Sequence, residues 1–315
     1  MSADAPIHPS RPEVSATPAT ATAATRTPVV AKQVLRDYLE LTKPEISFLV
    51  TISALAGFIL GMETMDWVAL CATLIGTMLT AGGVGALNHY LERDLDAKMR
   101  RTAGRPLPAG RISEKSARTF GYALVIAGIG LLCPLTNGLT GTLAALTVVL
   151  YLYVYTPLKR VTKYNTLIGT VPGALPALGG WTAATGSLDA GGWAIFLILA
   201  CWQMPHFFAL AWMYRKDYAR GGHAMLPVVE PDGRSTINQT LFYTIGLVIA
   251  SILPVVLNLS GLLYLVGALV LGADFLVASF RLYRTRTPQD ARRVLMASVR
   301  YIPLLVLLII IDRLV

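Results

Sequence analysis

Nine stretches of this chain are apolar and long enough to cross a lipid bilayer as helices, and they restrict the fold more than any other feature. A helix needs about 20 mainly apolar residues to span the hydrocarbon layer. No stretch alternates as a transmembrane β-barrel strand does, so the sequence predicts an all-α, polytopic membrane bundle of nine helices. The predicted spans are Ile46 to Gly61, Trp67 to Leu87, Thr119 to Pro134, Leu139 to Tyr155, Leu167 to Thr185, Trp193 to Tyr214, Thr240 to Leu259, Gly261 to Phe280 and roughly Val294 to Ile311.

Composition supports this prediction, because 54% of the 315 residues are hydrophobic and only 14% are charged, which exceeds what a soluble core needs. The fifth predicted span is unusual. Pro172 and Pro176 would bend or break it, with Gly169, Gly173 and Gly179 beside them, unless neighbouring helices satisfy the freed backbone carbonyls.

The distribution of charge predicts an orientation. All 27 Lys and Arg residues except Arg313 lie on or close to one predicted face, with Arg300 six residues inside the ninth predicted span, whereas the short connections on the other face carry Glu63, Asp66 and Asp189. Basic residues stay on the cytoplasmic side, so we expect a cytoplasmic amino terminus and an external carboxyl terminus in a bacterial cytoplasmic membrane. A mitochondrial inner membrane is the alternative. This distribution accounts for the net charge of +9 without nucleic acid, for which the sequence shows no binding module.

Residues 1 to 30 are rich in Ala, Thr, Pro and Ser and contain no apolar run, so we expect a disordered cytoplasmic tail. Residues 31–315 then form a single transmembrane domain. Cys71, Cys133 and Cys201 fall within predicted spans, far apart in sequence, and are interpreted as small core residues.

A segment dense in charges of both signs, NHYLERDLDAKMRRTAGRP from Asn88 to Pro106, follows the second predicted span. Asn88, Glu92 and Asp96 are spaced at i, i+4 and i+8 and share one face of a helix, whereas Asp94 points elsewhere. Carboxylate and amide oxygens at this spacing suit Mg²⁺, which prefers one or two carboxylates together with water and substrate phosphates.

Four basic residues follow these oxygen donors and are able to bind phosphate oxygens: Lys98, Arg100, Arg101 and Arg105. Acidic and basic groups in this order indicate a site for a diphosphate bridged by a metal ion. The alternative is that the basic residues only follow the charge rule for membrane topology and that the acidic residues pair with them.

Four motifs, taken in order, resemble the UbiA-type intramembrane prenyltransferases, and within that family the branch that farnesylates haem. The resemblance extends from about residue 35 to the end of the chain. The motifs are LTKPEI (Leu41 to Ile46), the charged segment just described, YTPLKRVTKYNTLIG (Tyr155 to Gly169) and WQMPHFFALAWMYRKDYARGGHAMLPVV (Trp202 to Val229).

The resemblance implies roles for particular residues. The family more often has Asp at the position of Glu92, and most members carry several aspartates where this chain keeps only Asp217. The implied catalytic residues are Asn88, Glu92, Asp96, His206 and Asp217, of which Asn88, Glu92, Asp96 and Asp217 would bind metal. The implied diphosphate-binding residues are Lys43, Lys98, Arg101, Arg105, Lys159, Arg160, Arg215 and Lys216.

His206 lies nine residues before Arg215, so it is expected roughly 13 Å of helix below the cytoplasmic surface, after Pro205, which loosens the helix. A neutral imidazole at that depth can ligate haem iron or accept a proton, although a lone histidine in a span more often serves packing. Asp274 lies about six residues inside the eighth predicted span, either as a functional group or as a partner of an arginine such as Arg281.

The resemblance implies Mg²⁺-dependent transfer of farnesyl from farnesyl diphosphate to a vinyl group of haem b, with water capturing the resulting cation. The expected partners are these two substrates, the lipid bilayer, and haem A synthase or a terminal oxidase assembly. A UbiA-type enzyme with another acceptor, such as an aromatic acid or quinone precursor, is the first alternative. A transporter is the second, but we find neither repeated halves nor a charged site near the midplane. Aromatic side chains that could face a carbocation or simply pack are Tyr151, Tyr153, Tyr155, Trp202, Phe207 and Phe208.

Overall fold

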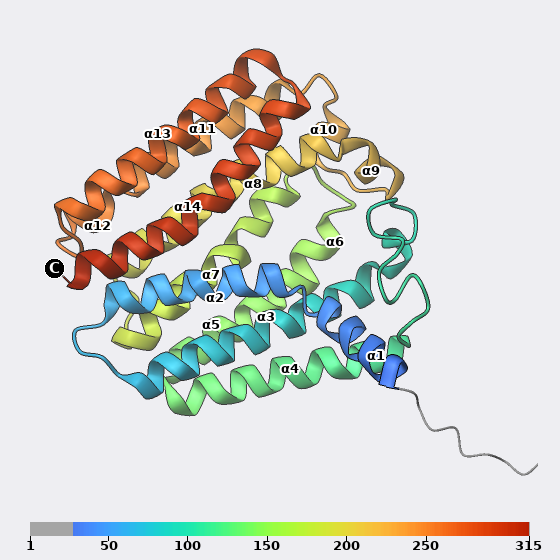
Figure 1. Cartoon of the computed structure of the whole chain (residues 1–315), viewed down its shortest axis with the longest axis horizontal. Helices are drawn as coiled ribbons and strands as arrows, with labels where there is room; N and C mark the ends of the chain where they lie inside the picture. Colours follow the sequence, from blue (N-terminus) through green and yellow to red (C-terminus); the bar gives the residue numbers. More distant parts are fainter. Residues whose placement is uncertain (1–27, 315) are drawn as a thin grey trace, which may run out of the picture.

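The computed structural model describes residues 28–314, and every regular element in that part of the chain is a helix (Figure 1). The predicted all-α fold is therefore confirmed. The elements are α1 (Pro28–Leu41), α2 (Pro44–Gly61), α3 (Trp67–Asp96), α4 (Glu114–Leu135), α5 (Gly138–Val149), a π-helical segment (Leu150–Tyr155), α6 (Thr156–Leu158), α7 (Asn165–Thr185), α8 (Ala190–Met213), α9 (Arg215–Arg220), α10 (Leu226–Val229), α11 (Arg234–Ala250), α12 (Leu253–Val256), α13 (Leu262–Thr285) and α14 (Pro288–Leu314).

Eight helical segments in the described residues are long and apolar enough to cross a membrane, and all eight correspond to predicted spans. The fifth predicted span is α7, a continuous helix that does not meet the same criterion, so the count of nine is not confirmed. The expected disordered tail lies almost wholly outside the described residues, and its last three positions, residues 28–30, begin α1.

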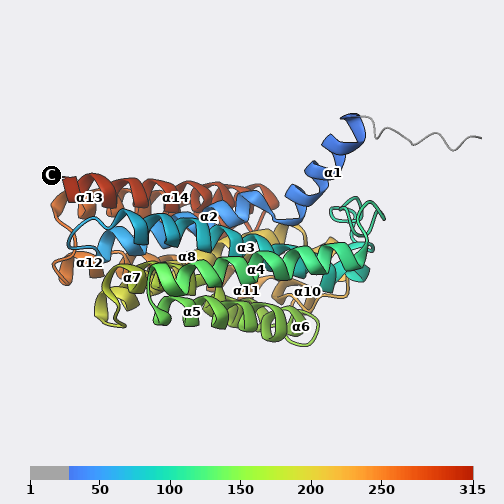
Figure 2. The same ribbon diagram turned by 90° about the horizontal axis from the view of Figure 1, so that it is seen from below.

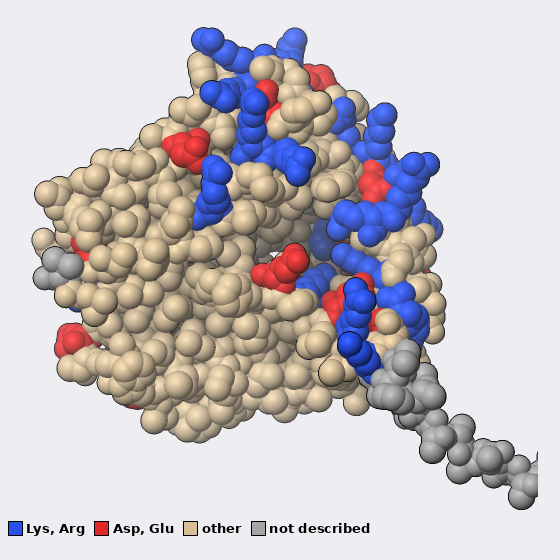
Figure 3. All heavy atoms as spheres, viewed as in Figure 1, with Lys and Arg blue, Asp and Glu red and all other residues tan. Residues whose placement is uncertain are grey.

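The long helices run alongside one another, and several of the segments that connect them gather at one end (Figure 2). This end includes α1, α6, α10 and the connection between α3 and α4, and α1 leaves the bundle at an angle (Figure 2). Basic side chains are gathered toward the same end (Figure 3). The arrangement brings segments far apart in sequence to one membrane surface.

Close contact between α2 and α7 explains how the proline-containing helix is held. A Cβ atom built on Gly180 of α7 would overlap the carbonyl oxygen of Ala54, and one on Gly57 of α2 would overlap a carbonyl oxygen of α7, so both positions require glycine. Small residues that let backbones approach are typical of membrane helix interfaces. Gln203 of α8 also donates a hydrogen bond to the carbonyl oxygen of Thr170 at 2.9 Å. Helix α7 is thus contacted closely by α2 and by α8.

A large apolar core packs six of the helices together. It joins α2, α7, α8, α11, α13 and α14 through buried rings such as Trp181, Trp202 and Tyr301. Two buried polar contacts connect α14 to its neighbours within this core: Trp202 Nε1 donates to the Ser298 carbonyl at 2.8 Å, and Ser251 Oγ lies 2.7 Å from the Tyr301 hydroxyl. The scaffold is packed, so the charged end is built on rigid elements.

The α2–α7 contact generates a prediction. Gly180→Ala should cost about 1–3 kcal/mol of stability, because the added methyl group forces two packed backbones apart. Gly130→Ala on α4 is the matched control, since a Cβ there meets no atom within 4 Å. The measurement is the melting temperature of the purified protein in detergent, and equal values for the two variants would contradict this account of the contact.

Candidate functional site

The predicted face of α3 is buried at the charged end of the bundle. Asn88, Glu92 and Asp96 are 1%, 7% and 1% exposed, whereas the side chain of Asp94 is 81% exposed. Helix α3 continues to Asp96, so the spacing places the three side chains on one face as predicted. Asp94 points away, also as predicted.

Each residue of this face contacts a basic side chain that comes from a different segment. The basic residues lie before α2, in the α3–α4 connection and after α6. The contacts are Lys43 Nζ to Asn88 Oδ1 at 2.5 Å, Lys159 Nζ to Glu92 Oε1 and Oε2 at 2.9 and 3.2 Å, and Arg105 Nη1 to Asp96 Oδ2 at 2.7 Å. We call these six side chains the paired centre. It contains two carboxylates and three basic groups, which leaves an excess of positive charge when all three are protonated.

The protonated form of Lys43 is poorly stabilised in the paired centre. It immediately precedes α2 and Pro44 with φ of 48°, a left-handed conformation that turns the chain sharply into the helix. Burial, followed by the charge of Arg105, lowers the pKa of Lys43 to about 7. The ammonium group is therefore poorly compensated by the protein alone, and an anion beside it would favour its charged form.

Lys159, in contrast, is held in its protonated form. Burial by itself would lower the pKa of Lys159, but the carboxylate of Glu92 and the neighbouring Tyr155 and Tyr151 outweigh it and raise the pKa above its usual value. The ammonium nitrogen also lies 4.7 Å from the centroid of the Tyr155 ring and 5.9 Å from that of Tyr151. Lys159 is thus a permanent positive charge at this surface.

Two buried histidines adjoin the paired centre, and no sequence pattern singles out either one. His89 and His223 are 2% and 4% exposed, and the Nδ1 atom of each is buried without a hydrogen-bond partner among the described residues. The chain next to His223 is fixed where the amide of Ala224 donates to the carbonyl of Lys159 at 2.7 Å. Both histidines lie inside the motifs already quoted, but a single histidine has no spacing pattern that reveals its surroundings.

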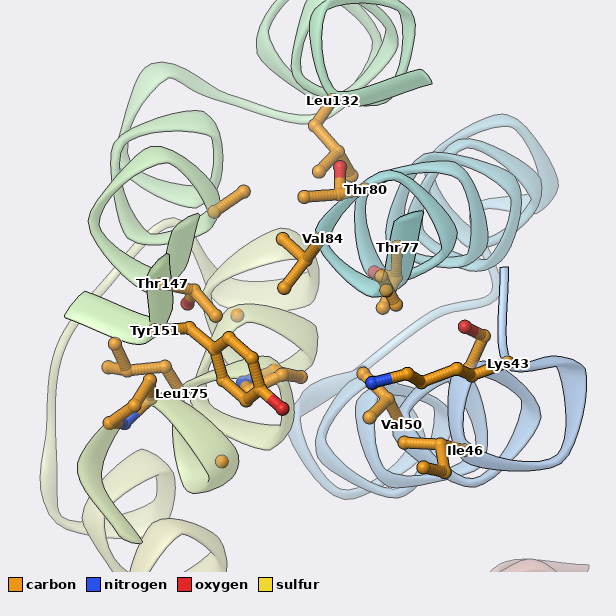
Figure 4. A pocket seen from close by; sticks show the side chains of 18 of the residues that line it. Lys43, Ile46, Val50, Thr77, Thr80, Val84, Leu132, Thr147, Tyr151 and Leu175 are labelled. Carbon is orange, nitrogen blue, oxygen red and sulfur yellow. The ribbon is translucent and has the colours of Figure 1, made fainter. Parts of the chain in front are cut away.

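An apolar cavity of about 110 Å³ begins at the paired centre and lies between α2, α3, α5 and α7. Lys43 and Tyr151 reach toward one another from opposite walls (Figure 4). The rest of the wall is largely apolar, including Val50, Val84 and Leu175 (Figure 4). Lys43 also borders a surface depression at the α1–α2 junction, which includes His89 and Arg105. One basic side chain therefore lies between the surface and the apolar interior.

The other predicted basic residues form an outer ring instead of joining the paired centre. Lys98, Arg101, Arg160 and Lys216 are exposed, and Arg215 is half-buried with its guanidinium 4.3 Å from the Trp212 ring. Three of them, Arg101, Arg215 and Lys216, line a shallow depression that also contains Asp217. The structure thus separates the predicted diphosphate set into inner and outer members.

Asp217 holds the α3–α4 connection. Its carboxylate accepts hydrogen bonds from the backbone amides of Arg100 and Arg101 at 3.1 and 3.3 Å and pairs with Arg220. Burial alone would raise the pKa of Asp217, but these hydrogen bonds keep it below the usual value. Within the described residues no three His, Cys, Asp or Glu side chains converge on a metal position. Asp217 therefore positions this connection in the resting protein, and its expected role as a metal ligand stays a prediction.

His206 and Asp274 lie away from the paired centre. His206 Nδ1 is 2.8 Å from Ser298 Oγ on α14, its ring stacks on Trp202, and it does not line the apolar cavity. Asp274 accepts a hydrogen bond from Arg300 at 2.8 Å, so its arginine partner is not Arg281. Neither residue is brought to the α3 face.

Comparison with known proteins assigns the family. The fold is that of a polytopic helical membrane protein with a charged centre at the end of an apolar cavity. The chain belongs to the UbiA prenyltransferase family, whose model matches residues 50–300. A protein of Salinibacter ruber named protoheme IX farnesyltransferase is 62% identical over 279 residues, which cover 88% of this chain and 99% of that protein. Another of that name, from Solibacter usitatus, is 47% identical over 289 residues, covering 89% and 99%.

Solved structures agree on the fold. One of digeranylgeranylglyceryl phosphate synthase superimposes with a TM-score of 0.73 at 18% identity, covering 89% of this chain and 99% of that one. A UbiA homologue from Archaeoglobus fulgidus bound to DMAPP and Mg²⁺ has a TM-score of 0.63 at 16% identity, covering 87% and 99%. At these identities the comparison concerns the fold alone.

The hydrogen bonds of Asp217 generate a prediction. Asp217→Asn should increase trypsin cleavage in residues 97–111 at pH 7, because an amide loses the ion pair with Arg220 and one of the two good acceptors for the backbone amides. The same loosening should appear in the wild type as pH falls through the lowered pKa of Asp217 and the carboxylate is neutralised. Asp232→Asn, at an exposed pair with Arg234, is the control. Unchanged cleavage with an altered Mg²⁺ dependence of diphosphate binding would instead mark Asp217 as a metal ligand.

Proposed function

We propose that this chain transfers a farnesyl group from farnesyl diphosphate to a vinyl side chain of haem b, with Mg²⁺. The observation that carries the proposal is the paired centre, where buried oxygen donors and three basic groups meet at one end of an apolar cavity. The names of the Salinibacter ruber and Solibacter usitatus relatives support the acceptor. Membership of a prenyltransferase family favours this enzyme over a transporter.

The paired centre is suited to bind the diphosphate by exchange of partners. Lys43, Arg105 and Lys159 turn from the α3 face toward phosphate oxygens, which they bind as charge-assisted hydrogen bonds. The freed oxygens of Asn88, Glu92 and Asp96 are the hard, buried donors that Mg²⁺ requires, together with oxygens of the diphosphate itself. When bound, Mg²⁺ neutralises negative charge on the diphosphate. The Archaeoglobus fulgidus homologue, bound to DMAPP and Mg²⁺, supports this combination of ligands.

The apolar cavity is suited to the farnesyl chain. Its walls bury hydrocarbon, and Lys43 at its edge fixes the diphosphate beside the allylic carbon. Ionisation breaks the C–O bond, and the electron pair leaves on the diphosphate, whose growing charge Arg105 and Lys159 stabilise. Tyr151 presents its ring to the allylic cation, and the apolar walls keep water away. The vinyl carbon of haem then forms the new C–C bond, and water adds to the resulting cation with loss of a proton.

We assign His206 to the acceptor side of the reaction. It lies on α8 against α14, apart from the cavity for the prenyl chain, and Ser298 and Trp202 fix its ring. In this proposal His206→Ala abolishes the haem product while diphosphate binding remains. Loss of both together would indicate that the histidine only supports the fold.

The proposal includes a location and an arrangement in the membrane. The active domain is residues 31–315, in the cytoplasmic membrane of a bacterium, with the paired centre facing the cytoplasm. The concentration of Lys and Arg at the end of the bundle that carries α1 supports this orientation (Figure 3). Haem A synthase or a terminal oxidase assembly would consume the product.

Reconstitution tests the function directly. Purified full-length protein supplied with farnesyl diphosphate, haem b and Mg²⁺ should yield a more hydrophobic haem whose mass equals haem b plus a farnesyl group and a hydroxyl group. Haem is separated by reversed-phase chromatography and identified by mass spectrometry. Unmodified haem, together with prenylation of an aromatic acid or a quinone precursor under the same conditions, would assign a different acceptor.

The α3 face provides a matched pair of variants. Asp96→Ala should abolish turnover at any Mg²⁺ concentration, because it removes a buried anionic ligand and leaves Arg105 without its carboxylate. Asp94→Ala should keep most activity, since that side chain is exposed and weakly paired. Initial rates over a Mg²⁺ titration measure both, and equal losses would contradict the assignment of this face.

The orientation is tested with reporter fusions. A reporter that is active only outside the cytoplasmic membrane should be active when fused after Val315 and inactive when fused after Asp232. The reversed pattern would place the paired centre on the external surface.

A further inference from the structure

A second basic site lies on the outside of the bundle, between α13 and α14. The two helices enclose a groove of about 590 Å³ lined by Arg281, Arg292, Arg293 and Arg300, with Asp274 as its acidic residue. Basic side chains gather at the end of the molecule where α13 and α14 meet (Figure 3). The groove is far along the chain from the motifs of the paired centre and shares no lining residue with the apolar cavity.

The positive charge of this groove is not balanced by the protein. Arg293 pairs with Asp290 at 2.5 Å and Arg300 pairs with Asp274 at 2.8 Å. Among the described residues, Arg281 and Arg292 have no carboxylate within 4.0 Å. Two guanidinium groups on opposite walls are therefore available for an anion, and their planar forks suit phosphate oxygens.

The two free arginines lie at the same level near a membrane surface. Arg281 is four residues before the end of α13 and Arg292 is four residues after the start of α14, which places both roughly 6 Å of helix from the turn. At the other end of the hairpin, Asp312 accepts a hydrogen bond from the Tyr264 amide at 3.0 Å and holds the helices in register. Helices of 24 and 27 residues exceed the roughly 30 Å of hydrocarbon, so their basic ends reach the headgroup layer.

The surface around the groove is amphiphilic. The floor contains buried Ala278 and Ala297, and the apolar wall residues Val277 and Met296 are 54% and 43% exposed. Farther from the turn, α13 and α14 expose further aliphatic side chains, namely Val266, Val270 and Leu307. A ligand that fits both parts carries an anionic head and hydrocarbon chains.

We propose that the α13–α14 groove binds the phosphate of an anionic phospholipid from the cytoplasmic leaflet. Arg281 and Arg292 bind the phosphate from opposite walls, and the acyl chains lie along the aliphatic surface below. Asp274 holds Arg300 about 10 Å deeper in the groove, which limits how far the headgroup can enter. Basic grooves between membrane helices on the cytoplasmic side favour such headgroups over zwitterionic ones. A general excess of basic residues on this face would not by itself produce opposed, unpaired arginines above an apolar floor.

Lipid binding to the purified full-length protein tests this site. Native mass spectrometry in detergent should show phosphatidylglycerol bound more tightly than phosphatidylcholine of the same acyl chains. The double variant Arg281→Gln, Arg292→Gln should weaken phosphatidylglycerol binding about 30-fold and leave phosphatidylcholine unchanged, since each arginine contributes one charge contact. The matched control is Arg284→Gln, Arg286→Gln, which removes the same charge from the same hairpin at positions that do not line the groove.

The outcomes separate the possible ligands. Preference for phosphatidylglycerol that is lost in the groove variant and kept in the control supports the site. Equal losses in both variants would reduce it to general surface charge, and competition by millimolar inorganic phosphate as strong as that by lipid would assign a free anion. If the groove variant loses affinity for haem b while its lipid binding is unchanged, the arginines serve the carboxylates of haem instead, and the proposal is overturned.

Discussion

Burial of carboxylates at a membrane surface is the constraint on which the charged end of this molecule depends. An unpaired carboxylate with the low exposure of Glu92 or Asp96 would be strongly destabilising, so each needs a cation beside it. Lys159 and Arg105 supply those cations from segments that follow α6 and α3, and Lys43 completes the row at Asn88. The positions of three connections are thus set by one face of one helix. Asp217, which holds the α3–α4 connection, and a smaller apolar cluster that includes Leu41 and Leu107 reinforce the same end.

The same pairs explain how a stable resting state can also bind a highly charged ligand. In the proposed function, a diphosphate with its metal ion would bring both an anion for the three basic groups and a cation for the oxygen donors, so new partners would replace every pair that separates within the protein. The exchange needs no large movement of helices, whose backbones are fixed by close packing such as that of Gly57 and Gly180. Lys43 is the most responsive member, since its pKa of about 7 in the free protein leaves it ready to take up a proton beside an anion.

Sequence alone predicted the parts that depend on local periodicity. Apolar runs located the long helices, and a spacing of four residues placed Asn88, Glu92 and Asp96 on one buried face. The ion pairs of the paired centre could not be predicted from the sequence, because Lys159 lies 67 residues from Glu92 and no local rule connects the two. The positioning role of Asp217 was inaccessible for the same reason, because its partners include backbone amides 116 and 117 residues away. His89 and His223 were missed since the significance of a lone histidine depends on unpaired burial, which only the fold reveals.

The position of Lys159 also explains why a glutamate suits position 92 better than an aspartate. Lys159 approaches Glu92 nearly symmetrically, at 2.9 and 3.2 Å from the two oxygens, and lies over the Tyr155 ring. The Tyr155 ring holds the ammonium group in place, so the side chain at position 92 must be long enough for its carboxylate to reach the ammonium group. The additional methylene of Glu92 provides that reach from α3. Aspartate at this position would shorten the side chain and leave Lys159 partly unpaired in a buried setting, which costs more than the extra rotamer freedom of glutamate. The length of the Glu92 side chain therefore matches the position of its cation in the resting protein.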